Sequence, residues 1–311
     1  MKKINITLGA ILTTGILFFA ACDYVKNPVQ KTTTTGGNST GGDSVVRRKA
    51  LVEDYTGHEC GNCPRQGRIL HQLKETIYHE KLIVLTVHAG GFATPHPTHN
   101  PPYPTDFQTS EGTTYNNNSD FGIIANPAFM INRTYYTDWA ARCSYTAGNG
   151  NLSGKIDSVV AAAADFKIDL SGITYDNVNN KINGVAKVTA LKSITGGLYK
   201  MVLVLSEDSV IAEQKDDDDT GPTTPYVPLF THRDVFRGTI NGAYGTTVFA
   251  GATVASGVSD SVSMQAFLIT PANYHPTLKP DHCNIVAYIY NADVNSPKYY
   301  ELFQVEEKEL K

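Results

Sequence analysis

The chain has 311 residues, of which 41% are hydrophobic and 18% charged, and its formal net charge is −4. This length allows two domains of ordinary size, and the apolar fraction is sufficient for buried cores. The sequence contains no basic stripe and no nucleic-acid-binding motif, so we expect no nucleic-acid partner.

The first residues have the layout of a secretory signal peptide. Lys2 and Lys3 give a positive start, and an apolar run over 4–19 follows. That run is short for a membrane span but typical of the apolar region of a signal peptide. We therefore predict that residues 1–21 are a signal peptide and that the protein is exported.

Cys22 directly follows two alanines, and this arrangement resembles the signal of bacterial lipoproteins, in which the cysteine becomes a lipidated N-terminus. Phe19 departs from that pattern, because leucine is usual at its position. Lipidation of this kind adds several acyl chains, which hold a protein stably on a bilayer. The alternative is an ordinary signal peptide with an unrelated cysteine. Residues 22–48 are rich in small polar residues and are predicted to form a flexible tether.

The first folded segment is predicted over residues 49–165. It alternates short β-branched runs with patterns of helical period. It also contains a long polar loop, and a loop of that length in a compact domain is usually functional or contains short helices. The predicted elements are a strand over 50–55, a helix over 64–80, a strand over 82–87, a loop over 88–118, a strand after Pro127 and a helix over 152–164.

Cys60 and Cys63 lie at the turn between the first predicted strand and the first predicted helix. Two cysteines at this spacing can close a small disulfide ring, and the helix dipole and free N–H groups lower the pKa of a thiolate there. We expect the first sulfur to be exposed and to attack a substrate, with Cys63 resolving the mixed disulfide. Two alternatives remain open. One is a structural disulfide on a scaffold that only binds, and the other is a metal site, for which a single pair is a weak signal.

The order of strand, helix with a cysteine pair at its start, parallel strand, proline-led strand and helix resembles the thioredoxin fold. Thioredoxins carry a buried aspartate six residues before the first cysteine, where Asp54 stands, and a cis-proline opposite the cysteines, where Pro127 follows a Phe-Gly-Ile segment. The resemblance implies that Asp54 accepts a proton from Cys63 and that Pro127 shapes a groove for the substrate backbone. This sequence departs from the family at Glu59, where tryptophan is usual, and at Pro64, where lysine or arginine is common.

The second segment, residues 166–311, changes to a period of two. Apolar and polar residues alternate, and Gly, Asn, Asp and Pro separate the runs. This pattern predicts an antiparallel sandwich. The candidate strands cover 166–170, 181–188, 199–205, 235–240, 246–249, 261–269, 284–290 and 299–305.

Signal, tether, thioredoxin-like segment and sandwich together resemble one family, the outer-membrane lipoproteins of Gram-negative bacteria named after "outer membrane protein twenty-eight". The most family-like stretch runs from Leu51 to Gly57 and into the Cys-x-x-Cys-Pro motif, with support from 205–208 and 284–291. The resemblance implies an outer-membrane location and an α/β thioredoxin-like domain followed by an all-β immunoglobulin-like sandwich. Some members are discussed as surface antigens or adhesins, so the implied partners are envelope or extracellular proteins.

Several histidines have two interpretations. A protonated His58 would stabilise a thiolate at Cys60, or His58 is an exposed loop residue. His88, His96 and His99 lie around the long loop, and paired imidazoles can bind zinc or copper. The many prolines of that loop favour irregular backbone over a ligand cage, so we expect no bound metal and no cofactor.

Three further groups have a functional and a structural interpretation. The aspartates of 216–219 are either a calcium loop or, as their mutual repulsion favours, a solvated mobile loop. Cys143 and Cys283 either form a bridge between the two halves or are both buried thiols outside any disulfide. Four loop tyrosines either form a binding surface or pack the loops. They are Tyr103, Tyr115, Tyr135 and Tyr136.

Overall fold

The computed structural model describes residues 45–139, 141–145, 151–251, 253–264, 267–270 and 277–310. Val45–Lys311 forms one compact unit. The predicted signal peptide, Cys22 and most of the predicted tether lie outside the described residues. Within the described ranges, no helix is both long and apolar enough to span a bilayer.

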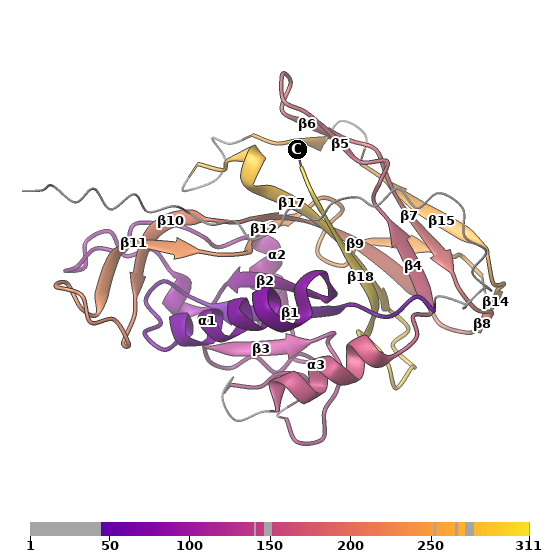
Figure 1. The fold of residues 1–311 in the computed structure, drawn as a ribbon, viewed down its shortest axis with the longest axis horizontal. Coiled ribbons are helices and arrows are strands. Elements are labelled where there is room, and N and C mark those ends of the chain that lie inside the picture. Colours follow the sequence, from indigo (N-terminus) through magenta and orange to yellow (C-terminus); the bar gives the residue numbers. More distant parts are fainter. Residues whose placement is uncertain are drawn as a thin grey trace, which may run out of the picture. The chain divides into compact units, whose positions relative to one another are not determined.

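A mixed sheet is the largest element of this unit (Figure 1). In the described part of the chain it has eight strands in the order β18-β17-β9-β12-β2-β1-β3, with β13 paired to β9. β1 and β2 are parallel, in register from Ala50 opposite Leu82 to Thr56 opposite His88, and β3 is antiparallel to β1. The strands are β1 (Ala50–Thr56), β2 (Leu82–His88), β3 (Ala128–Ile131), β9 (Tyr199–Glu207), β12 (Val235–Thr239), β13 (Thr246–Val248), β17 (Cys283–Asn291) and β18 (Leu302–Glu309).

Helices cover both faces of the β1–β3 part of the sheet. Leu70 of α1 and Ile156 of α3 belong to the core on one face, and Tyr115 of α2 belongs to the core on the other. Pro64 lies in the first turn of α1, where its missing N–H costs no hydrogen bond. The predicted first and last helices and a short helix in the long loop are confirmed. The helical segments are α1 (Cys63–Leu73), the π-helical turn Lys74–Tyr78, the 3-10 turns His79–Lys81, Gly91–Ala93 and Pro280–His282, α2 (Ser110–Asn116) and α3 (Leu152–Ala161).

β9 supplies side chains to two separate cores. Met201, Leu203 and Leu205 pack in one core with β4 (Phe166–Asp169) and β7 (Val185–Ala190), whereas Val202 and Val204 pack in the other with β1 and β2. Successive side chains of a strand point to opposite faces, so both faces of β9 must be apolar. This explains why β9 reads as a continuous apolar run, and β17 follows the same rule.

The remaining strands form smaller sheets. Phe166 of β4, Val188 of β7 and Val262 of β15 form one layer of the core that includes Leu203. The sheets are β15-β7-β4, β16-β6-β5, β14-β8 and β10-β11. Their strands are β4 (Phe166–Asp169), β5 (Thr174–Asp176), β6 (Lys181–Asn183), β7 (Val185–Ala190), β8 (Ile194–Thr195), β10 (Val210–Lys215), β11 (Tyr226–His232), β14 (Thr253–Val254), β15 (Ser259–Ser263) and β16 (Phe267–Leu268).

The two predicted segments share the main sheet. β2 of the first segment pairs in parallel with β12 of the second, with Val235 opposite Thr86, and Thr86 N donates to Asp234 O at 2.8 Å. The fold is therefore mostly β with few helices and a mixed sheet. The predicted division at residue 165 does not coincide with an edge of this sheet, because β12, β9, β17 and β18 extend it beyond β2.

A buried ion pair joins the two halves of the sheet. Arg133 follows β3 and donates to the Glu53 carboxylate through Nε at 2.7 Å and Nη2 at 2.6 Å. Nη2 also donates to the hydroxyl of Tyr288 on β17 at 3.0 Å. The Arg133 side chain is fully buried, and its guanidinium lies 4.8 Å from the centre of the Phe121 ring. The guanidinium of Arg133 and the carboxylate of Glu53 thus balance each other's charge in a place that water does not reach.

Candidate functional site: a covered disulfide at the start of α1

The cysteine pair forms a disulfide in the turn that leads into α1. The sulfurs of Cys60 and Cys63 are 1.99 Å apart and the Cα atoms 5.4 Å. Cys60 N donates to Gly57 O at 3.0 Å and Cys63 N donates to Cys60 O at 3.2 Å, which fixes the turn. Cys63 is the first residue of α1 and Pro64 the second. The disulfide therefore lies at the N-terminus of the helix.

The first sulfur is covered. Cys60 and Cys63 are each only 3% exposed, so the expectation of an exposed leading cysteine is wrong. The reason is the β10–β11 hairpin, which packs on the turn. Gln214 Nε2 donates to Cys60 O at 3.2 Å, and Asp217 N donates to Gly61 O at 2.9 Å. A Cβ at Gly61 would lie 2.1 Å from the Asp217 carboxylate, so glycine permits this close approach.

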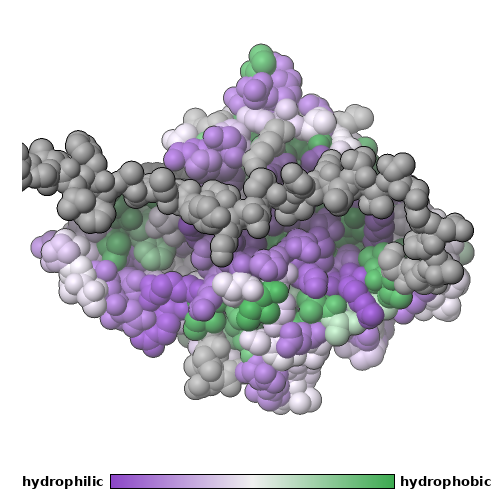
Figure 2. Space-filling model, in the orientation of Figure 1, coloured by the Kyte–Doolittle hydropathy of each residue, from purple (hydrophilic) through white to green (hydrophobic). Residues whose placement is uncertain are grey.

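Two arginines of α1 hold the acidic tip of the hairpin. Arg65 Nε donates to Asp218 at 2.7 Å, and Arg68 donates to Asp216 at 2.6 Å and to Asp218 at 2.9 Å. The hydrogen bond from Arg65 lowers the pKa of Asp218 to about 2. The expectation of a solvated mobile loop is therefore wrong for Asp216 and Asp218, because the arginines compensate their repulsion. Figure 2 shows the hydrophilic surface on the side where α1 begins and the hairpin ends.

Asp54 lies within β1, only 2% exposed, beneath the start of α1. Gln66 Nε2 donates to its Oδ1 at 2.5 Å. Burial raises the pKa of the Asp54 carboxyl to about 7 even though this hydrogen bond lowers it. Asp54 and Cys63 both line a cavity of about 250 Å³, and His232 of the hairpin lines it too. This carboxyl can therefore hold or release a proton near neutral pH in the cavity that Cys63 also lines.

Pro127 follows a cis peptide bond and directly precedes β3. The residue before it, Asn126, donates through Nδ2 to Thr56 O at 3.0 Å and to Ala89 O at 2.8 Å. These bonds connect the carboxyl ends of β1 and β2. Asn126 also lines a cavity of about 530 Å³ together with Glu59, the residue before Cys60. The structure thus places the proline loop at the same end of β1 as the cysteine turn.

His58 is completely buried, with its ring stacked on Tyr103 at 5.6 Å between centroids. Burial lowers the pKa of His58, because the charged imidazole loses its hydration. Both interpretations from the sequence are therefore wrong: His58 is neither an exposed loop residue nor a protonated partner of a thiolate at neutral pH.

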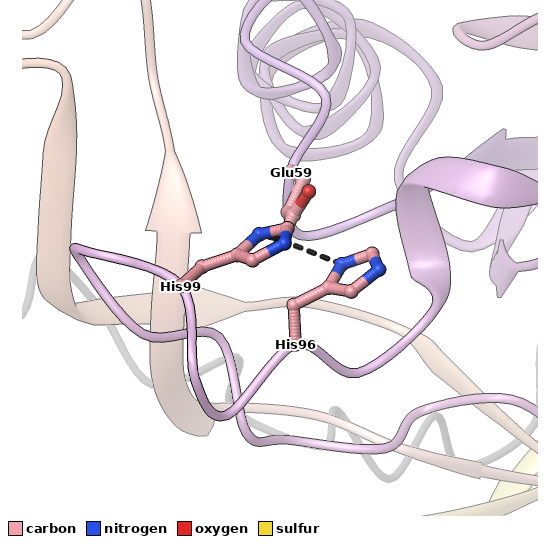
Figure 3. A group of neighbouring side chains, drawn as sticks. All are labelled: Glu59, His96 and His99. Carbon is pink, nitrogen blue, oxygen red and sulfur yellow. Dashed lines mark hydrogen bonds and ion pairs between the residues drawn. The ribbon is translucent and has the colours of Figure 1, made fainter.

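The other loop histidines separate into two places. His88 at the end of β2 is buried against Phe107, 4.3 Å between ring centroids. His96 and His99 instead converge on the carboxylate of Glu59 (Figure 3). The structure therefore brings together two of the three histidines noted in the sequence and adds Glu59 to them.

Cys143 and Cys283 lie in different cores. Cys143 packs in the core of β1 and β2, and its Sγ lies 3.1 Å from Gly122 O. Cys283 packs in the core of β4 and β7. Of the two interpretations left open by the sequence, the bridge is wrong and buried thiols outside a disulfide are confirmed.

The loop tyrosines mostly serve packing. Tyr103 and Tyr115 are 7% and 1% exposed, Tyr136 is half-buried, and Tyr135 is exposed. A binding surface made by all four is therefore excluded, because two of the rings are buried.

The β10–β11 hairpin is the part of the site that sequence reasoning missed. A weak signal exists, since Val210–Lys215 and Tyr226–His232 are short β-rich runs on either side of an acidic turn. Pro225 and Pro228 argue against a strand there. Nothing in the sequence indicates that this hairpin packs on residues about 150 positions earlier, which are joined to it by the Gln214–Cys60 contact.

No family model matches the sequence, and no curated protein matches it. Among solved structures, HBP35 of Porphyromonas gingivalis is similar, with a TM-score of 0.55 and 10% identity over 85% of this chain and 76% of HBP35. That similarity shows a shared fold and nothing more. A domain of the outer membrane lipoprotein Omp28 from the same organism matches 48% of this chain and 89% of its own length at 15% identity. Its TM-score of 0.26 is too low to carry an argument.

Proposed function

We propose that this chain is an exported lipoprotein of the bacterial outer membrane and that its Cys60–Cys63 pair exchanges disulfides with other envelope proteins. The observation that carries the proposal is the cavity that Cys63 and Asp54 both line, where burial raises the pKa of the Asp54 carboxyl to about 7. Carboxyl groups whose pKa lies this far from the ordinary value occur most often at functional sites. Lipid on Cys22 would anchor the protein.

The proposed architecture is a thioredoxin-like domain over 49–165 followed by an immunoglobulin-like sandwich over 166–311. Support for the first part comes from the parallel β1–β2 pair, the disulfide at the start of α1 and the cis bond before Pro127. Support for the second comes from the β15-β7-β4 layer that packs on β9 and β17.

The exchange reaction starts here from the oxidised protein. A substrate thiolate attacks Sγ of Cys60, the bond to Cys63 breaks, and Cys63 leaves as a thiolate that takes the proton of the Asp54 carboxyl. A second substrate thiolate then attacks the substrate sulfur of the mixed disulfide, and Cys60 leaves as a thiolate. The substrate loses two electrons as its own disulfide forms, and the protein gains them as the Cys60 thiolate and the Cys63 thiol. The same steps in reverse reduce a substrate disulfide.

The hairpin must move before any of these steps, because a sulfur is attacked along the axis of its S–S bond and Cys60 is covered. Some of the contacts that keep the hairpin on the turn are exposed to solvent. Arg65 and Asp218 lie at the surface, and ion pairs at such positions contribute little to stability. Opening of the hairpin is thus a local event that need not unfold the sheet. We propose that a partner protein displaces it.

A second candidate function is a surface-binding lipoprotein in which the disulfide is structural. The observation that favours it is the 3% exposure of both cysteines. In that case the hairpin is permanent, and the disulfide fixes the turn that the hairpin packs on.

A redox titration in glutathione buffers, followed by mass mapping, separates the two candidates. For an exchange protein we expect Cys60–Cys63 to equilibrate at a potential in the range of cellular oxidoreductases, from about −120 to −270 mV. Insulin reduction should disappear in the Cys60→Ser, Cys63→Ser double variant. The Asp54→Asn variant keeps both sulfurs and should slow exchange near neutral pH. A potential below about −300 mV, with no insulin reduction by the wild type, would establish the structural disulfide instead.

The anchor is tested separately by the Cys22→Ala variant. We expect the wild type to fractionate with outer membranes and to incorporate labelled palmitate, and the variant to lose the label and enter the soluble fraction. Palmitate-free wild-type protein would refute the lipoprotein part of the proposal without affecting the exchange chemistry.

A further inference from the structure

Glu59, His96 and His99 form a compact group of metal-ligating side chains beside the disulfide turn. The Nδ1 atoms of His96 and His99 lie 2.8 and 3.1 Å from the same carboxylate oxygen of Glu59. One ligand atom from each residue lies within 4.8 Å of the others. Figure 3 shows both imidazoles extending from one loop toward Glu59. We infer that these three side chains bind a divalent transition-metal ion of the zinc type.

The backbone holds the ligands in place without the metal. Glu59 N donates to Phe92 O at 3.0 Å, which joins the cysteine turn to the long loop. His96 forms an antiparallel bridge with Tyr103, with backbone distances of 2.6 and 3.0 Å, and His99 N donates to His96 O at 3.2 Å. This tight turn puts both imidazoles on one side, where their rings stack at 4.1 Å. A preorganised ligand set loses little conformational entropy on binding.

The distances within the group match the edges of a metal coordination shell. Zinc binds imidazole nitrogen and carboxylate oxygen at about 2.0–2.2 Å, so two ligand atoms at a tetrahedral angle are about 3.4 Å apart and at a right angle about 2.9 Å. The two distances from Glu59 to the imidazoles are 2.8 and 3.1 Å. The two distances to Glu59 therefore already suit a bound ion, whereas the stacked imidazole rings must rotate so that both nitrogens face it.

The ligand set indicates the class of ion. Two imidazoles and one carboxylate suit zinc, copper and nickel, whereas calcium and magnesium prefer oxygen alone. His99 is half exposed at 52% of its side chain, so solvent reaches the group and water can complete the coordination. Three protein ligands with an open position are the arrangement of exchangeable and catalytic zinc sites. The Irving–Williams order then predicts that Cu²⁺ binds more tightly than Ni²⁺ and Zn²⁺.

This site does not depend on the exchange chemistry. In the oxidised protein both sulfurs are in the disulfide and supply no thiolate ligand. His88, the third histidine of the loop, is buried against Phe107 and takes no part. The ion would tie the turn before Cys60 to the long loop from the side opposite α1, with the side chain of Glu59 as the link.

The test is a calorimetric titration of the oxidised, full-length protein, produced without a polyhistidine tag, with ZnCl₂ alone. We expect one ion per chain. His96→Ala, His99→Ala and Glu59→Gln should each weaken binding at least about tenfold, since even partners of metal ligands change affinity by 10–100-fold. His71→Gln, which removes a histidine of α1 outside the group, should leave the affinity unchanged and serves as the matched control.

A spectroscopic readout checks the ligands directly. The Cu²⁺ electron paramagnetic resonance spectrum of the wild type should show splitting from two nitrogens, and that of His99→Ala from one. His99 is exposed, so this variant is expected to fold, and circular dichroism verifies it. Zinc binding that is absent at millimolar concentration, or that is unchanged in His99→Ala, would overturn the inference. Binding that persists in the Cys60→Ser, Cys63→Ser variant confirms that the site is independent of the cysteines.

Discussion

Replacing Asp54 with asparagine removes a titration that destabilises the fold near neutral pH. An aspartate in the unfolded chain ionises near 3.8, whereas burial raises the pKa of folded Asp54 to about 7. Between these values the folded protein keeps a proton that the unfolded chain has released. Stability therefore falls as the pH rises through this window, and the loss is complete above pH 7.

The loss of folding free energy follows from the difference between the folded and unfolded pKa of Asp54. Each pKa unit corresponds to about 1.4 kcal/mol, so a rise from 3.8 to about 7 costs about 4 kcal/mol once both states are ionised. Asparagine cannot ionise, and its Oδ1 can still accept the hydrogen bond from Gln66 Nε2. We expect the stability of Asp54→Asn relative to the wild type to increase by about 3–4 kcal/mol from pH 4 to pH 8.

The assay is urea unfolding followed by circular dichroism at five pH values from 4 to 8, with the disulfide intact in both proteins. Asp120→Asn, at an exposed position, is the control and should change the difference by less than about 0.5 kcal/mol across the range. Parallel stability curves for Asp54→Asn and the wild type would refute the reasoning, because they would mean that folded Asp54 ionises as an exposed carboxyl does.

Three further changes test the packing. Arg65→Ala with Arg68→Ala removes the ion pairs at the hairpin tip and should speed dithiothreitol reduction of the disulfide severalfold, measured by thiol trapping; an unchanged rate would mean that the hairpin does not limit access. Glu53→Gln leaves Arg133 buried with no countercharge, and should lower the free energy of unfolding in urea by about 3–5 kcal/mol; a loss under 1 kcal/mol would contradict this. Leu203→Ala opens a cavity in the core of β9, at a cost of about 2–5 kcal/mol in the same assay.

The elements with a strong local sequence pattern were predictable, and those fixed by distant contacts were not. β1, β2 and β17 are buried on both faces and stand out as β-rich apolar runs, and the cysteine pair with Pro64 marks the start of α1. The covered state of Cys60 comes from a hairpin that follows β9 in the chain, and no local pattern carries that information. The sequence could therefore indicate the chemistry of the turn but not its accessibility.

The metal-ligating group illustrates the same limit of local pattern. His96 and His99 are noticeable as a close pair, but Glu59 lies 37 residues before His96 and reads locally only as an unusual substitute for tryptophan. Its carboxylate meets the imidazoles because the long loop folds back to the turn through Phe92 O. Likewise, the sequence of the acidic run suggests only that the carboxylates of Asp216 and Asp218 repel one another. In the fold, Arg65 and Arg68 of α1 pair with them and compensate their charge.

The pairing of β2 with β12 bears on how fragments of this chain will behave. A fragment that stops at residue 165 would leave β2 without the strand that pairs with it at Thr86, and a fragment that starts at 166 would leave β12 without β2. Unprotected strand edges of this kind recruit other chains. We expect either fragment to aggregate on expression, and intact protein to lose its secondary structure in a single cooperative transition.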